Sequence, residues 1–404
     1  MIDDSSRLRI DLLTREYPPE VYGGAGVHVE YLARDLRRLA DVRVHCFGGP
    51  RDEPGVTAYA DPPGLAKANA ALRTMGVDLE MAAGAAGADV VHSHTWYANL
   101  AGHTASLLHG IPHVVTTHSL EPLRPWKAEQ LGGGYALSSW CEKTAIEGAA
   151  AVVAVSAGMR RDVLAAYPSV DPDRVQVVHN GIDTEQYQPD KATDAMERFG
   201  IDPASPSVVF VGRITRQKGL PYLLRAAREL PPEVQLVLLA GAPDTPEIAA
   251  EVESLVGELR SGRSGVVWVA EMVSKPEVVQ VLSHATVFVC PSIYEPMGIV
   301  NLEAMACEAA VVATATGGIP EVVADGQTGV LVPIEQVPDG SGTPVDPDRF
   351  VADLADALNR VVSDPGRARE MGLAGRVRAI ERFSWASIAE RTLEVYRSAL
   401  AAVG

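Results

Sequence analysis

Two glutamates, Glu295 and Glu303, lie eight positions apart in Y-E-P-M-G-I-V-N-L-E. Apolar residues recur at helical spacing from Ile299 onward, which predicts a helix that begins just after Gly298. The first N–H groups of that helix have no partner within it, so they would point into the loop and could bind an anion.

The two carboxylates could act as a general acid and base, as in hydrolases, or they could bind the hydroxyl groups of a ligand. Pro296 and Gly298 favour a loop around Glu295, so the two acids should approach a ligand from different heights. Hydroxyl binding fits that geometry better than acid/base cooperation. Two solvated glutamates are the alternative that the local sequence leaves open.

Two cations, Arg213 and Lys218, follow the predicted strand at residues 208–211. Ligands in α/β domains bind at the carboxyl ends of the strands, and two cations there would suit a diphosphate. Gly212 and Gly219 would let the ligand approach the backbone closely. Charges on a surface loop are more often merely solvated, and the position at a strand end in a net acidic chain favours the functional interpretation.

An early glycine-rich loop contains Gly23 and Gly24, between the first predicted strand and the first predicted helix. Without side chains in the way, an anion could reach backbone N–H groups at the start of that helix. The spacing matches neither G-x-G-x-x-G nor G-x-x-x-x-G-K-[ST], so a dinucleotide site or an ordinary P-loop is unsupported. A loop that needs glycine only for its turn explains the pattern equally well.

Three histidines, His92, His94 and His118, lie at or near predicted strand ends. A metal site would need a third ligand with the right geometry, and no carboxylate or cysteine pattern supplies it. We therefore predict no metal site and favour hydrogen bonding to sugar hydroxyls, with a structural role in the core open for one of the three.

The composition excludes several classes of partner. The 35 basic and 52 acidic residues of this 404-residue chain give a net charge of −17, which argues against nucleic acid or an anionic membrane as the main partner. The four cysteines show no pairing or metal spacing, so buried thiols in a reducing cytosol are expected. No apolar run approaches membrane-spanning length, and we expect a soluble, cytoplasmic protein.

The fold class is α/β, because strand and helix patterns alternate along the chain. We expect two doubly wound domains with parallel sheets, at residues 1–188 and 189–384, with a final helix from Trp385. Ligands would bind in a cleft at the carboxyl ends of both sheets. Strands are expected at 8–13, 42–47, 89–92, 113–117, 151–155 and 175–178, and then at 208–211, 234–239, 265–269, 286–290, 310–313 and 329–332.

Together these features resemble the retaining glycosyltransferases of the GT-B fold, in the family 4-like group, over nearly the whole chain. Glu295-x7-Glu303 is the most specific element. G-R-x-x-x-x-K-G at 212–219, N-G-I-D at 180–183, T-G-G at 316–318 and F-S-W at 383–385 support it. T-R-E-Y-P-P-E-V-Y-G-G-A-G-V-H-V and H-S-L-E-P-L-R-P-W-K are similar to an actinobacterial glycogen synthase group that makes α-maltose 1-phosphate from ADP-glucose and glucose 1-phosphate.

The resemblance implies two Rossmann-like domains facing a cleft, the first binding the acceptor and the second the nucleotide sugar. The C-terminal helix would cross back, so that residues 385–404 complete the first domain. Arg213 and Lys218 would hold the donor diphosphate, Glu303 the ribose and Glu295 the glucose. His118 would lie beside the reacting carbon. The remaining donor-binding residues would be Gly23, Gly24, Gly298, Ile299, Thr316, Gly317 and Gly318.

One departure concerns the acceptor. Classical bacterial glycogen synthases carry H-D-W where this chain has His94-Thr95-Trp96, so an acid that helps the acceptor there is missing. A phosphorylated acceptor becomes the better expectation, with His94 and Trp96 at its site and its phosphate neutralised by Arg124 and Lys127.

The resemblance implies transfer with retention and no metal or cofactor besides the nucleotide sugar. Four alternatives stay open: a glycogen synthase acting mainly on glucan ends, a mannosyltransferase using GDP-mannose, a sugar-nucleotide 2-epimerase, and a non-catalytic glycan- or nucleotide-binding protein. The lack of a basic amphipathic stretch argues against a membrane-surface enzyme. A homodimer is left open as well.

Overall fold

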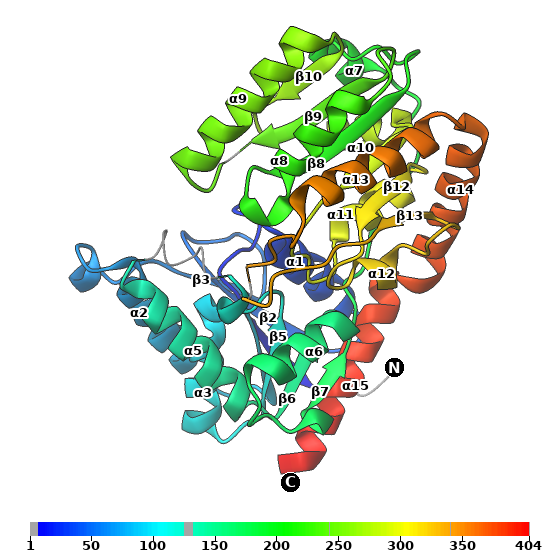
Figure 1. The fold of residues 1–404 in the computed structure, drawn as a ribbon. Coiled ribbons are helices and arrows are strands. Elements are labelled where there is room, and N and C mark those ends of the chain that lie inside the picture. The colour runs from blue at the N-terminus through cyan, green and yellow to red at the C-terminus, as the bar shows by residue number, and fades with distance from the viewer. Residues whose placement is uncertain (1–6, 125–131, 242, 340, 404) are drawn as a thin grey trace. The chain divides into compact units, whose positions relative to one another are not determined.

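The computed structural model describes residues 7–241, 243–339 and 341–403, except 125–131 (Figure 1). The chain forms two compact units: Met1–Gly181 with Trp385–Gly404, called unit 1, and Ile182–Ser384, called unit 2. The division after Gly181 lies seven residues before the one predicted after residue 188. The intervening segment is tied to the end of unit 2, since the Ile182 N–H donates to the Phe383 carbonyl over 2.7 Å.

Unit 1 contains a seven-stranded sheet in the order β3-β2-β1-β4-β5-β6-β7, and every paired register in it is parallel. The strand order reverses between β1 and β4. Six of these strands lie where the sequence predicts them. The strands are β1 (Arg9–Leu13), β2 (Asp41–Phe47), β3 (Val56–Tyr59), β4 (Val90–His94), β5 (His113–Thr117), β6 (Ala151–Ala154) and β7 (Val175–Val177).

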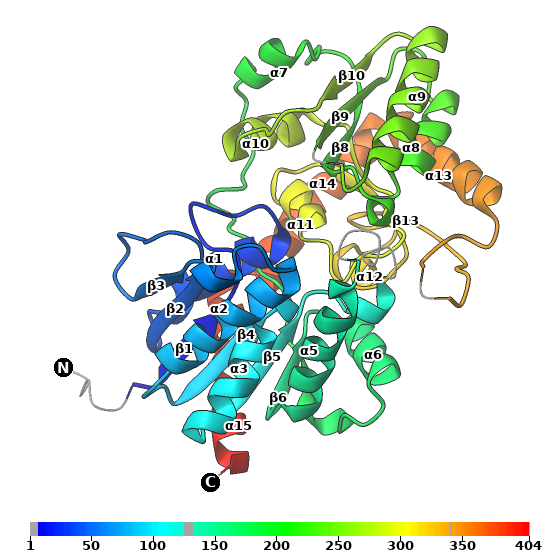
Figure 2. The same cartoon turned by 90° about the vertical axis from the view of Figure 1, so that its left-hand side faces the viewer.

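Helices cover both faces of this sheet, as the nearly continuous burial of its central strands requires. One face packs against α1 and α15, where Ile10 and Leu12 meet Leu32 and Tyr396. The other face is covered by α2 and α3 (Figure 2). There Leu13 packs among apolar residues of these two helices. The helical elements are α1 (Gly24–Leu36), η2 (Pro63–Leu65), α2 (Ala70–Gly84), α3 (Trp96–His109), η3 (Glu121–Leu123), α5 (Gly134–Gly148), α6 (Ala157–Ala166), η4 (Pro172–Arg174) and α15 (Trp385–Val403).

The C-terminal helix α15 therefore belongs to unit 1, as expected. Its residues Ile388 and Tyr396 are fully buried. The Tyr396 hydroxyl lies 2.6 Å from Nδ1 of His92 on β4. This buried hydrogen bond fixes the helix against the sheet, in addition to the apolar packing.

Unit 2 contains a six-stranded sheet in the order β10-β9-β8-β11-β12-β13, and its pairs are also parallel. The order reverses between β8 and β11. All six strands lie where the sequence predicts them. They are β8 (Ser207–Arg213), β9 (Gln235–Gly241), β10 (Val266–Val269), β11 (Val287–Cys290), β12 (Ala310–Thr314) and β13 (Gly329–Val332).

The core of unit 2 forms where strand residues such as Leu236 and Leu238 pack with Leu224, Val252 and Leu358 of three helices. The four cysteines of the chain are buried and free, as expected. None of the helices in the described ranges is both long and apolar enough to cross a membrane. The helical elements of this unit are α7 (Asp194–Phe199), η5 (Arg216–Lys218), α8 (Leu220–Ala226), η6 (Ala227–Glu229), α9 (Pro246–Gly262), α10 (Lys275–His284), α11 (Ile299–Ala306), α12 (Ile319–Val322), α13 (Pro347–Val362) and α14 (Pro365–Arg382).

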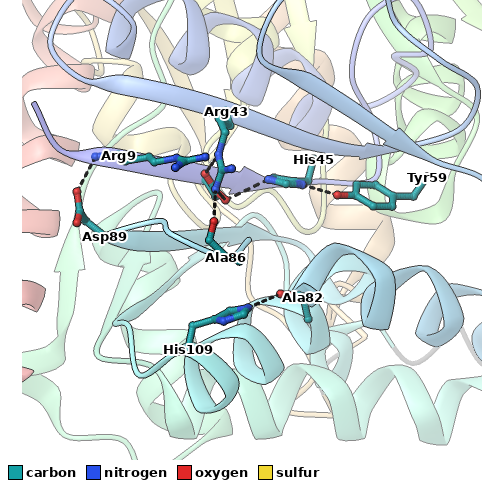
Figure 3. Close-up of polar contacts among 9 residues, drawn as sticks. Arg9, Arg43, His45, Tyr59, Ala82, Ala86, Asp89 and His109 are labelled. Atoms are coloured by element: carbon teal, nitrogen blue, oxygen red, sulfur yellow. Dashed lines mark hydrogen bonds and ion pairs between the residues drawn. The ribbon is translucent and has the colours of Figure 1, made fainter. Parts of the chain in front are cut away.

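A polar network joins the first three strands of unit 1 (Figure 3). Asp11 on β1 is fully buried, and its carboxylate accepts from Nε of Arg43 over 2.6 Å. His45 lies beside both, with Nε2 3.1 Å from the Asp11 carboxylate and Nδ1 2.8 Å from the Tyr59 hydroxyl. A buried carboxylate is tolerated only when it is paired, so this network ties β1, β2 and β3 in one register.

Substitution Asp11→Ala should destabilise the protein by about 3 kcal/mol, because it leaves Arg43 half-buried without its partner. Urea unfolding followed by circular dichroism measures the effect. Asp61→Ala is the matched control, because it breaks an ion pair with Arg73 at the surface. The Asp61 side chain is 52% exposed, so its loss should cost about 1 kcal/mol or less. Equal losses for the two variants would contradict the structural role of the network.

Candidate active site

The candidate donor residues lie in unit 2, on segments that follow neighbouring strands. Arg213 ends β8, and Lys218 lies in η5 directly after it. Glu295 lies in the loop after β11, which pairs with β8. Ligands of parallel sheets bind where the strand order reverses, and β8 and β11 are the strands on either side of that reversal.

Lys218 and Glu295 form an ion pair in which Glu295 is buried and Lys218 is half-buried. The Lys218 ammonium donates to Oε2 of Glu295 over 2.6 Å, and the Ser292 hydroxyl donates to the same oxygen over 3.2 Å. Burial alone would lower the pKa of Lys218, but the Glu295 carboxylate outweighs it and the pKa lies above its usual value. Lys218 therefore carries its charge at neutral pH, although the surrounding protein shields it.

The predicted helix after Gly298 is α11, and it begins at Ile299 as expected. Gly298 has a φ of +83°, a conformation that residues with side chains rarely adopt. A Cβ atom there would also lie 2.4 Å from the side-chain amide nitrogen of Asn301. This glycine is therefore required both for the turn into the helix and for the close contact.

The T-G-G motif holds the backbone of the Glu295 loop. The Gly318 N–H donates to the Glu295 carbonyl over 3.0 Å, and a Cβ at Gly317 would lie 1.9 Å from that same oxygen. The Thr316 hydroxyl donates to Gln336 over 3.4 Å. In this structure the Gly318 amide binds the loop, so Gly317 and Gly318 fix the position of the Glu295 backbone.

The second glutamate, Glu303, has a different environment. It lies on α11 and is half-buried, and burial raises the pKa of its carboxyl although a hydrogen bond from Tyr187 opposes the shift. Arg213 has an exposed guanidinium whose Nη1 lies 3.0 Å from Asp244. Tyr187 and Asp244 have no motif spacing that would have identified them from the sequence.

The backbone N–H groups of the early glycine loop in unit 1 bind a carboxylate of the same chain, that of Glu16. The N–H groups of Tyr22 and Gly23 donate to Oε2 of Glu16 over 3.0 and 2.8 Å. Gly26 is needed in this arrangement, since a Cβ there would lie 2.7 Å from the Glu16 side chain. The Glu16 carboxylate thus occupies these amides, and a ligand could use the Gly23 N–H only by displacing it.

His94 and Trp96, predicted at the acceptor site, are 0% and 3% exposed. Nδ1 of His94 lies 3.0 Å from Nε2 of His118, which is half-buried. His94 therefore supports the His118 ring from a fully buried position. Thr95, which lies between His94 and Trp96 in the sequence, has a φ of +63°. This conformation is strained for a β-branched residue, and such strain often marks functional sites.

Of the three histidines predicted, His92 has the structural role. It is fully buried, with Nε2 2.7 Å from the Thr116 hydroxyl and Nδ1 bonded to Tyr396. A fourth histidine, His28 on α1, was missed, and its ring centroid lies 4.7 Å from that of His118. Of the two predicted phosphate-binding cations, Arg124 donates to the Ser119 hydroxyl over 2.7 Å, and Lys127 lies outside the described residues.

Comparison with known proteins supports the same architecture. Residues 22–186 match the family described as Glycosyltransferase Family 4, and residues 205–364 match Glycosyl transferases group 1. The chain is 60% identical to an alpha-maltose-1-phosphate synthase of Mycolicibacterium smegmatis over 96% of this chain and 99% of that protein. It is 56% identical to that of Mycobacterium tuberculosis strain H37Rv over 98% and 100%.

Among solved structures, sucrose-phosphate synthase from Thermosynechococcus elongatus superposes with a TM-score of 0.78 and 26% identity, over 98% of this chain and 100% of that one. The two doubly wound parallel sheets thus have the GT-B fold that the sequence predicts.

Substitution Glu295→Gln should lower the pKa of Lys218, because burial then acts without the carboxylate that offsets it. The pH dependence of acetic anhydride labelling at Lys218, followed by mass spectrometry, measures this change. Asp244→Asn, which removes the partner of Arg213, should leave the Lys218 titration where it is. An unchanged titration in Glu295→Gln would show that the ion pair is absent in solution.

Proposed function

We propose that this chain, which belongs to glycosyltransferase family 4, transfers glucose from ADP-glucose to glucose 1-phosphate and so makes α-maltose 1-phosphate. The chain is a hexosyltransferase of the GT-B fold. The observation that carries the narrower proposal is 60% identity to an alpha-maltose-1-phosphate synthase across 96% of the chain. The choice of ADP-glucose rests on the motif resemblance described above.

Unit 2 supplies the donor site in this proposal. Lys218, kept charged by Glu295, and the exposed Arg213 bind the diphosphate of the donor. Glu295 keeps acceptor capacity on its carboxylate for the glucose hydroxyls, and Glu303 accepts from the ribose hydroxyls. Neither glutamate acts as a nucleophile in this proposal. Glu295 pairs with Lys218 and Glu303 accepts from Tyr187, so the two glutamates do not act as an acid/base pair.

The bond from the anomeric carbon to the β-phosphate oxygen breaks, and its electrons stay with the ADP that leaves. A hydroxyl oxygen of the acceptor forms the new bond on the same face, with retention, and its proton passes to the leaving phosphate. Negative charge grows on that phosphate in the transition state, so a fixed cation such as Lys218 stabilises the transition state more than the bound donor.

Unit 1 supplies the acceptor side. His118 offers a half-buried imidazole to the sugar, and His94 holds its ring from behind. Arg124 lies six residues further along the chain and would bind the acceptor phosphate, together with Lys127. Because His94-Thr95-Trp96 lacks the acid of H-D-W, a phosphorylated acceptor is proposed in preference to a glucan end.

The direct test offers purified protein ADP-, UDP- and GDP-glucose and GDP-mannose, each with glucose 1-phosphate or glycogen, and resolves the products by mass. A disaccharide phosphate formed from ADP-glucose and glucose 1-phosphate is expected. Elongated glycogen as the main product would favour the glycogen synthase alternative, and transfer from GDP-mannose would favour a mannosyltransferase. Release of ADP without any transfer product would contradict the proposed reaction.

Substitution Lys218→Ala should reduce turnover at least tenfold, which corresponds to about 1.4 kcal/mol of transition-state stabilisation. Steady-state kinetics with ADP-glucose measures the loss. Lys191→Ala removes an exposed lysine of the same unit and should retain wild-type turnover. Wild-type turnover in Lys218→Ala would rule out its role at the diphosphate.

Activity should survive exhaustive chelation, because the proposed step uses Lys218, Arg213 and backbone groups to stabilise the leaving phosphate. The same assay run after dialysis against a chelator checks this. Activity that disappears and returns on addition of a divalent metal would contradict the proposal that no metal is needed.

A further inference from the structure

Three imidazoles of unit 1 converge on one point. His28 comes from α1, His94 from the end of β4 and His118 from the segment after β5. A ligand nitrogen from each lies within 4.8 Å of the other two. The ring centroids are 4.7 Å apart for His28 and His118, and 5.3 Å apart for each of the other two pairs.

The distances between the ligand nitrogens can be compared with those in a three-histidine metal site. With zinc–nitrogen bonds of about 2.1 Å and tetrahedral angles, the ligand nitrogens would be roughly 3.4 Å apart. Nδ1 of His94 and Nε2 of His118 are already 3.0 Å apart. The other two pairs lie within 4.8 Å, so one ion would have to draw His28 toward the other rings by about 1.4 Å at most.

Asn180 fixes the tautomer of His28 in the form that metal binding needs. The Asn180 side-chain oxygen, which can only accept, lies 2.6 Å from Nδ1 of His28, so Nδ1 carries the proton. Nε2 then presents a lone pair, and it is buried without a hydrogen-bond partner in the described part of the chain. Histidine ligands of metals are oriented by this kind of contact.

The protonation of the cluster suits a cation. Burial lowers the pKa of His28 to about 4 and also lowers the pKa values of His94 and His118, so the three rings are neutral at pH 7. A cluster with only a structural role would leave Nε2 of His28 unsatisfied, at a cost of about 1–3 kcal/mol.

We propose that His28, His94 and His118 bind one divalent transition metal ion of the Zn²⁺ class. The ion takes Nε2 of His28, Nδ1 of His94 and Nε2 of His118, and the proton between the last two moves to the distal nitrogen of its own ring, so all three imidazoles bind as neutral ligands. His118 is half-buried whereas the other two are buried, so the ion enters past His118.

A bound ion should inhibit transfer, because it fixes the imidazole that meets the sugar. This consequence rests on the proposed function of His118, whereas the binding site itself does not. The site is also compatible with activity after chelation, since removing an inhibitory ion leaves the catalytic groups in place.

Isothermal titration of the metal-free full chain with Zn²⁺ tests the site, with the visible spectrum of the Co²⁺-loaded protein as a second readout. One ion per chain and the ligand-field bands of tetrahedral Co²⁺ are expected. His28→Gln should weaken binding at least tenfold, and Asn180→Ala about tenfold through loss of the orienting contact. His103→Gln, at a partly exposed histidine of α3, should bind as the wild type does.

The absence of one-to-one binding, or equal binding by wild type and His28→Gln, would overturn the metal site whatever the activity shows. If His28→Gln does not fold by circular dichroism, wild-type affinity in Asn180→Ala overturns the assignment of His28 as an oriented ligand. Zn²⁺ binding without any effect on transfer would leave the metal site standing and contradict the placement of His118 at the sugar.

Discussion

The ion pair of Lys218 and Glu295 is the interaction on which the candidate donor site depends. It joins the segments after β8 and β11, the two strands at which the sheet order of unit 2 reverses. A carboxylate this deeply buried requires a cation, and a cation this shielded requires a carboxylate. The neighbouring features serve the pair: Gly318 holds the Glu295 backbone, and Gly298 turns the chain into α11.

Unit 1 repeats the same plan with different chemistry. Its sheet order reverses between β1 and β4; Glu16 follows β1, and His94 is the last residue of β4. The Glu16 carboxylate accepts from the N–H groups of the glycine loop, and the buried His94 ring contacts His118. Both side chains are thus paired within the unit.

Local patterns predicted the elements well because most strands here are short buried apolar runs between polar turns. β3 was missed since its V-T-A-Y is only partly buried at a sheet edge. The helix start at Ile299 was predictable because a glycine precedes a helical repeat. The pairing of Lys218 with Glu295, 77 residues apart, has no local signal, and neither does the approach of His28 to His118. Both depend on which strands become neighbours.

The central claim is that Lys218 and Glu295 act on the donor as one unit, and a double-mutant cycle tests it most directly. kcat/KM for ADP-glucose would be measured in wild type, Lys218→Ala, Glu295→Ala and the double variant. Groups that act as a unit show non-additive losses. The account predicts that the double variant is about as impaired as the worse single variant. Losses that multiply, as for independent residues, would contradict it.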